Sequence, residues 1–188
     1  MLLVTTTIPS FSPSFYGLSE TIPSSPGAPS IEAAISVPTE PGSGGPWSGS
    51  EGVEYAWLMA ETTSRHHFTQ IGWQWSPGGW PVLFAYTGWP GDQWTEPWAT
   101  MAWSGRQYIG PPVHGSVLVR IQAVSGTSAD TRRWYADQVF VDGKWETLQS
   151  YPLTRPLFYA ASESYDKSFL KQVCFTFVTS DLGHRCFG

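Results

Sequence analysis

The hexapeptide FVDGKW at residues 140–145 is the stretch from which the fold is best read, because it predicts a tight β-hairpin. Both central positions of a type I′ turn need a positive φ, and the Asp142-Gly143 pair adopts that conformation at little cost. The residues on either side extend into apolar segments of strand character. This stretch therefore predicts two antiparallel strands joined by a two-residue turn.

Alternation of apolar and polar residues carries the same signal outward along the chain. In residues 116–124, Val117, Val119 and Ile121 share one face while Arg120 and Gln122 share the other, the pattern of a half-buried strand. No amphipathic helical window of useful length lies between the Gly and Pro turns. The period of two predicts further strands at residues 31–37, 53–61, 66–75, 81–87, 98–103, 134–141, 144–148, 157–162 and 172–179.

Many short strands at even spacing are typical of a sandwich or barrel, so the expected class is an all-β, antiparallel two-sheet β-sandwich. We expect helix content below about 10% and one core between the two sheets. The residues expected in or near that core are Ile71, Trp73, Val117, Val119, Ile121, Phe140, Phe175 and Phe177.

The first fifty residues differ in composition from the rest. They contain no Lys or Arg and are dominated by Pro, Ser, Thr and Gly, which predicts an extended arm and linker at 1–50 before a sandwich domain at 51–188, with a first strand from 31. A solvated spacer has no use for large apolar anchors, so we expect the arm to pack on neighbouring subunits as part of a homo-oligomer or polymer. The anchors are Phe11, Phe15, Tyr16, Leu18 and Ile22.

Charge and composition exclude several partners. Only 13% of the residues are charged, about half the usual share, and the net charge is −5 with 10 basic residues. Phosphate binding needs a basic footprint, so nucleic acid is not an expected partner. No run approaches the ~20 apolar residues of a membrane span, which predicts no membrane insertion. Residues 1–8 show no signal peptide, yet the composition is typical of proteins outside the cell or on a cell or virion surface.

Tryptophan is the most conspicuous residue type, with 11 in the chain. Flat rings stack on the apolar faces of sugars, whereas ring burial in the core is the alternative use of the same residues. The turn at 89–94 and Trp98 offer rings that are hard to bury beside polar groups. The candidate ligand-binding residues are therefore Trp89, Asp92, Gln93, Trp94 and Trp98.

No motif in the chain predicts a metal or a cofactor. Cys174 and Cys186 are compatible with one disulfide or with two buried thiols, and neither forms a Cys-x-x-Cys motif. His66 and His67 are adjacent, so on a strand they face opposite sides and do not readily bind one ion. Nucleophile elbows and phosphate loops are also missing from the sequence.

A resemblance adds to this interpretation. The segments ISVP (35–38), YAWL (55–58), FTQIG (68–72) and FAYTGWP (84–90) occur in the order found in the concanavalin A-like, jelly-roll sandwiches of the glutamic peptidase and neprosin group. The chain resembles that group over residues 31–180. The resemblance implies that Gln70 matches the catalytic glutamine and Glu163 the catalytic glutamate, which would stabilise an oxyanion and activate water on one concave face. Thr87 stands where the group carries a glutamate, which favours a non-catalytic relative.

Three classes of function follow. The leading hypothesis is a non-enzymatic structural module, extracellular or on a virion surface, that self-assembles into an oligomer or filament through its arm. The first alternative is a lectin-like, carbohydrate-binding module. The second is a glutamic-type acid endopeptidase.

Overall fold

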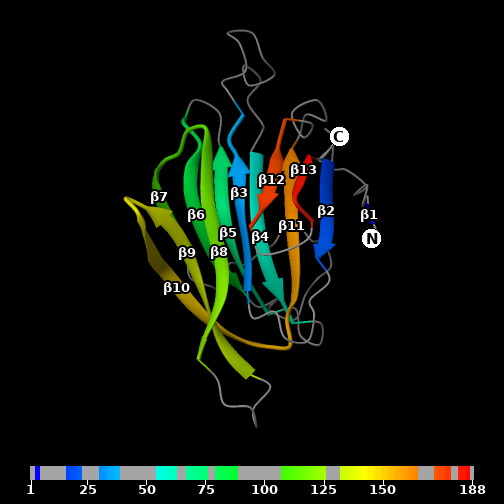
Figure 1. Ribbon diagram of the computed structural model, residues 1–188, viewed down its shortest axis with the longest axis vertical. Helices are drawn as coiled ribbons and strands as arrows, with labels where there is room; N and C mark the ends of the chain where they lie inside the picture. Colours follow the sequence, from blue (N-terminus) through cyan, green and yellow to red (C-terminus); the bar gives the residue numbers. More distant parts are fainter. Residues whose placement is uncertain are drawn as a thin grey trace.

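A computed structural model gives the architecture of the chain (Figure 1). It describes residues 3–4, 16–22, 30–38, 54–62, 67–75, 79–88, 107–125, 132–164, 172–178 and 182–186. These residues form two antiparallel sheets and no helix, so the predicted all-β class and two-sheet sandwich are confirmed. Over the same ranges there is accordingly no helix long and apolar enough to cross a membrane.

One sheet, here called sheet A, has seven strands. In spatial order they are β1 (Leu3–Val4), β2 (Tyr16–Ile22), β11 (Leu157–Ser164), β4 (Glu54–Glu61), β5 (Phe68–Trp75), β6 (Val82–Gly88) and β7 (Gln107–Pro112). Sheet B has six, in the order β10 (Lys144–Thr154), β9 (Arg132–Val141), β8 (Ser116–Ser125), β3 (Ser30–Ser36), β12 (Cys174–Phe177) and β13 (His184–Cys186). Neighbouring strands of one sheet are therefore often far apart in sequence.

The β9–β10 hairpin forms as predicted. Asp142 has φ 50° and Gly143 has φ 81°, the two positive values that a type I′ turn requires. Strand β10 continues to Thr154, beyond the predicted end at 148, because a bulge between Thr147 and Gln149 lets the pairing with β9 resume. The sequence pattern missed β1, β2, β7 and β13, whereas the strand expected at 98–103 lies outside the described residues.

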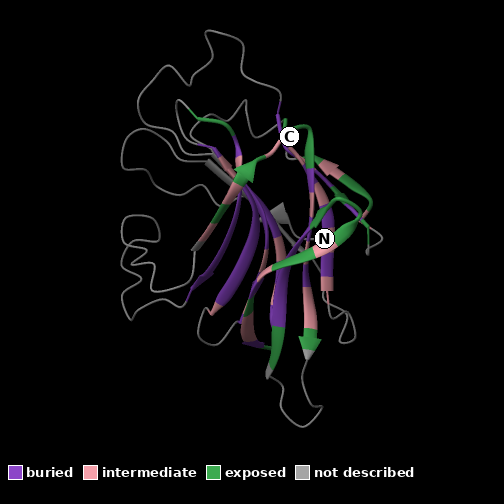
Figure 2. Cartoon of the chain, turned by 90° about the vertical axis from the view of Figure 1, so that its left-hand side faces the viewer, coloured by how far each residue is buried: buried purple, intermediate pink, exposed green. Residues whose placement is uncertain are grey.

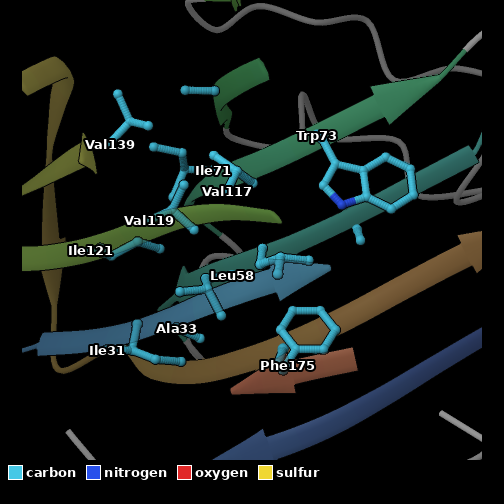
Figure 3. Packing of buried hydrophobic residues seen from close by; sticks show 14 of the residues in the cluster. Ile31, Ala33, Leu58, Ile71, Trp73, Val117, Val119, Ile121, Val139 and Phe175 are labelled. Carbon is cyan, nitrogen blue, oxygen red and sulfur yellow. The ribbon is translucent and has the colours of Figure 1, made fainter. Parts of the chain in front are cut away.

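The core lies between the sheets. In Figure 3, Ile71 from β5 lies beside Val117 and Val119 from β8, and all three are buried. Figure 2 shows the buried stretches gathered along the middle of the strands, with exposed residues toward several strand ends. Seven of the eight predicted core residues are confirmed as buried: Ile71, Trp73, Val117, Val119, Ile121, Phe175 and Phe177.

The prediction for Phe140 is wrong. Its side chain is 40% exposed, while its neighbour Val139 is buried against the core. Successive residues of a strand face opposite sides, so a strand that buries Val139 must turn Phe140 away from the opposite sheet. Phe140 consequently lies on the outer face of sheet B.

Part of the predicted arm belongs to the sheets of its own chain. Strand β2 pairs with β11, aligning Tyr16 with Ser164, Leu18 with Ser162 and Ile22 with Phe158. Strand β3 lies between β8 and β12 in sheet B, so the sandwich includes residues 30–36. Strand β11 would otherwise end sheet A with unpaired backbone groups, and β2 satisfies them. Phe11 and Phe15 lie outside the described residues.

Assembly through the arm stays a prediction. The hydrogen bonds of β2 to β11 are the same whether β2 comes from the same chain or from a second copy, as in strand exchange. If copies exchange β2, deleting residues 1–22 should convert assemblies of the full-length chain into monomers, as measured by light scattering. An unchanged mass for a folded truncated chain would contradict the prediction.

Candidate functional site

The predicted peptidase pair lies on sheet A. Gln70 on β5 stands between Met59 of β4 and Tyr86 of β6, and its side chain is 7% exposed. Its neighbours Thr69 and Ile71 face sheet B, so Gln70 belongs to the outer face of sheet A. Glu163 on β11 is aligned with Tyr55 of β4. The placement of its side chain is outside what the structure describes.

The register does not bring the two backbones side by side. Tyr55, aligned with Glu163, and Met59, aligned with Gln70, are separated by roughly 13 Å along β4, and the width of two strand spacings adds about 10 Å across the sheet. The residue of β11 that faces Gln70 across Met59 is Tyr159. In this row the position from which a carboxylate could act with Gln70 is therefore taken by a phenol.

Glu61 is a second carboxylate of this face and was not among the predicted site residues. Its partner on β5 is Phe68, which places Glu61 diagonally across from Gln70 at about 7–8 Å between Cα atoms. Burial raises the pKa of Tyr159, and the negative charge of Glu61 raises it further. Glu61 and Tyr159 are thus close enough to interact electrostatically.

Aromatic side chains fill the rest of this face. Trp57, Phe84 and Tyr86 form a cluster with Ala161, and the rings of Phe84 and Tyr86 lie 4.7 Å apart. The hydroxyl of Tyr86 donates to Oε1 of Gln74 at 2.6 Å. Phe84 is 0% exposed and Trp57 only 8%, so these rings offer no open surface to a ligand.

The outer face of sheet B instead exposes aromatic side chains at its two ends, on either side of the buried Gln138. The name sheet B face is used below for six side chains of this surface: Trp134, Phe140, Trp145, Arg120, Gln138 and Thr147. Trp134 is 49% exposed at one end, and Phe140, 40% exposed at the other end, packs edge-on against Trp145 at 5.3 Å. A rise of about 3.4 Å per residue separates Trp134 from Phe140 by roughly 20 Å along β9.

Polar groups lie between these aromatic ends. The Arg120 guanidinium sits 4.0 Å from the Trp145 ring centroid, and its Nε donates to Gln138 Oε1 at 2.6 Å. The Gln138 amide in turn donates to Thr147 Oγ1 at 2.8 Å. Glu32 lies 4.0 Å from the guanidinium on the other side. The polar side chains are therefore held in fixed positions by one another, an arrangement that preorganises them for a ligand.

The ligand-binding residues expected from the sequence all lie outside the described residues: Trp89, Asp92, Gln93, Trp94 and Trp98. Trp134 and Trp145 were not among the predicted binding residues, although the alternation of buried and exposed residues along β9 indicates an outward position for Trp134. Trp134 has the same strand parity as Gln138 and the opposite parity to Tyr135, which is buried.

A buried acid joins the two sheets. Asp137 of β9 is 0% exposed, and its Oδ2 accepts hydrogen bonds of 2.5 Å from Thr69 Oγ1 on β5 and from Gln149 Nε2 on β10. Its Oδ1 and the Oε1 of Gln149 are buried with no hydrogen-bond partner among the described residues. Burial raises the pKa of Asp137 to about 8, so the carboxyl is mainly protonated at neutral pH.

Comparisons with known proteins give a weak structural likeness. No family model matches the chain, and no curated protein matches it. A solved structure of scytalido-glutamic peptidase with a transition state analog inhibitor is 15% identical, with a TM-score of 0.42 over 84% of this chain and 80% of that chain. A second, with a peptide-based transition state analog, is 17% identical, with a TM-score of 0.39 over 71% of this chain and 57% of that one.

The chain thus spans little more than half the length of the second of these peptidase chains.

Proposed function

We propose that this chain is a non-catalytic module that binds a glycan along the sheet B face. The observation that carries the proposal is the pair of exposed aromatic ends, Trp134 and Phe140 with Trp145, separated by a fixed strip of hydrogen-bonding side chains. An extended sugar chain has alternating apolar ring faces and hydroxyl edges. Rings at both ends of the strip would stack on the ring faces. Arg120 and Thr147 would bond the hydroxyl edges, and the buried amide of Gln138 would hold both of them in place.

Charge narrows the ligand class. The chain carries a net charge of −5, and Glu32 lies 4.0 Å from the guanidinium of Arg120. A polyanionic glycan would meet repulsion from the whole protein. The proposed ligand is therefore an uncharged polysaccharide, long enough to run along β9.

The proposed location is outside the cell or on a cell surface, where such polymers occur. The partly exposed disulfide between Cys174 and Cys186 supports this, because disulfides persist in oxidising compartments.

The peptidase alternative has less support on this chain. Its two implied residues, Gln70 and Glu163, are offset along sheet A. The β11 residue in the same row as Gln70, beyond Met59 of β4, is Tyr159 and not a carboxylate. An activated water requires a carboxylate within hydrogen-bond reach of the reacting group.

Aromatic substitution tests the proposed glycan site. Trp134→Ala and Phe140→Ala should each weaken binding of cellohexaose, xylohexaose or chitohexaose by about tenfold or more, because each removes a stacking ring. Isothermal titration measures the affinity. Trp80→Ala is the matched control, because Trp80 is 59% exposed but belongs to the segment before β6 in sheet A. It should keep the affinity of the unmodified chain.

Two outcomes would contradict the proposal. One is the absence of binding to all three oligosaccharides and to the corresponding insoluble polymers. The other is an equal loss of affinity in the Trp80 variant. If instead Trp134→Ala lowers the mass of the protein in light scattering, the sheet B face is a contact between copies, and the structural hypothesis gains support.

A further inference from the structure

The β12–β13 hairpin places three metal-ligating side chains together at the edge of sheet B. Cys174 is paired with Cys186, and the next pair on the same face joins Thr176 to His184. The ligand atoms of Cys174, His184 and Cys186 all lie within 4.8 Å of one another. These residues are far from any Cys-x-x-Cys spacing, which is why the sequence predicted no metal site.

The histidine is already aimed at the sulfur atoms. His184 Nε2 lies 3.2 Å from Cys186 Sγ, and His184 Nδ1 lies 2.9 Å from Thr176 Oγ1. When Nδ1 carries the proton and donates to Thr176, Nε2 presents its lone pair toward the cysteines. A second hydrogen bond that fixes the tautomer and orientation of a ligating histidine is a regular feature of metal sites.

In the structure the two cysteines form a disulfide. We propose that the reduced hairpin binds one thiophilic divalent cation, such as Zn²⁺, through Cys174 Sγ, Cys186 Sγ and His184 Nε2. Metal–sulfur and metal–nitrogen bonds of about 2.3 and 2.1 Å at tetrahedral angles put each sulfur about 3.6 Å from the nitrogen and the two sulfurs about 3.8 Å apart. His184 Nε2 already lies 3.2 Å from Cys186 Sγ, and the two sulfurs move apart once reduction has cleaved the bond between them. Water takes the fourth position.

The disulfide and the metal site exclude each other. A dithiol reductant supplies two electrons and two protons, cleaves the S–S bond and leaves two thiols, while the dithiol itself becomes a disulfide. Binding of the cation then releases the two thiol protons, because thiolates are the ligands. The hairpin is therefore oxidised and metal-free in an oxidising compartment, and metal-bound where thiols are kept reduced. This inference does not depend on the proposed glycan site.

Cobalt binding tests the proposal. The full-length chain is reduced with dithiothreitol, freed of it under nitrogen and titrated with Co²⁺. We expect thiolate-to-cobalt charge-transfer absorption that saturates at one ion per chain and disappears on adding Zn²⁺. The chain has two cysteines in all, so no other thiol contributes. The oxidised chain should give no such absorption.

Two substitutions test His184 as the third metal ligand and Thr176 as the residue that orients its ring. His184→Gln should weaken Co²⁺ binding at least tenfold, and Thr176→Val should weaken it by about tenfold through loss of the orienting hydrogen bond. His114→Gln is the control, because His114 is also exposed but packs against Trp80 at 5.4 Å. Three results would overturn the proposal. They are equal Co²⁺ affinities in the His184 and His114 variants, saturation at half an ion per chain, and no charge-transfer absorption in the reduced chain.

The hairpin itself could loosen when the disulfide is reduced. In that case one equivalent of Zn²⁺ should restore the circular dichroism of the reduced chain but not that of the His184→Gln variant. Failure to restore it in the unmodified chain would also overturn the proposal.

Discussion

Asp137→Asn should flatten the pH dependence of stability and make the chain more stable than the original above pH 8. Asp137 is fully buried, and burial raises its pKa to about 8 from an ordinary 3.8. The hydrogen bonds from Thr69 and Gln149 act in the opposite direction but do not offset burial. Asparagine has the same shape, keeps an oxygen for both donors and carries no charge at any pH.

The direction in which stability changes with pH follows from proton binding by Asp137. Between pH 4 and about 8 the folded chain holds a proton on Asp137 that the unfolded chain has lost. The stabilisation of the folded chain by this bound proton is fully present below pH 4. It is lost as the pH rises toward 8, by up to about 1.4 kcal/mol per pH unit. The total is on the order of several kcal/mol. The asparagine variant lacks this slope.

Urea unfolding from pH 4 to 9 measures the effect as the difference in free energy of unfolding between the variant and the original chain. Asp142→Asn is the matched control, because Asp142 is an exposed turn residue with φ 50°, a conformation that asparagine also adopts. It should keep the original slope. The same slope in the Asp137 variant would show that the acid is not held protonated.

Trp73→Ala should lower the free energy of unfolding by about 3–5 kcal/mol, the usual cost of emptying a large aromatic site in a core. Trp73 is 0% exposed between the sheets, and its indole N–H donates to the carbonyl of Ser36 on β3 at 3.0 Å. The substitution therefore leaves both a cavity and a carbonyl without that donor. The hydrogen bond also ties sheet A to sheet B.

Chemical denaturation of the variant against Trp80→Ala separates burial from residue type. Trp80 is 59% exposed, so its loss should cost about 0.5 kcal/mol or less. Trp73→Phe should recover much of the packing but not the hydrogen bond, and should lie between the two. Similar losses for Trp73→Ala and Trp80→Ala would contradict the placement of Trp73.

Local signals in the sequence determined the fold class and much of the core. The Asp142-Gly143 turn depends only on the φ preferences of two neighbouring residues, and the structure has it where the sequence predicts it. The alternation of Val117, Val119 and Ile121 with Arg120 and Gln122 identifies a buried face without knowledge of the partner strands. Both signals act over a few residues, so no long-range contact is needed to predict them.

Alternation does not predict which residues face the core where a strand is apolar on both sides. The run Val139-Phe140-Val141 does not say which residue faces the core, and the wrong side was predicted for Phe140. The orientation of this strand is determined by the opposite sheet, which packs against Val139. The same packing brings Trp134 and Phe140 to one outer face.

The candidate sites depend still more on contacts between distant segments. Asp137 is one acid among several in the sequence. Its burial, which raises its pKa, arises only where β9 packs against β5 of the opposite sheet and pairs with β10, the strands that contribute Thr69 and Gln149. The offset of Gln70 from Glu163 is a matter of strand register, and the convergence of His184 with two cysteines comes from the pairing of β12 with β13. These pairings bring together residues that are far apart in the sequence, and sequence spacing does not predict their distance in space. Only the tertiary structure therefore decided which residues meet at each candidate site.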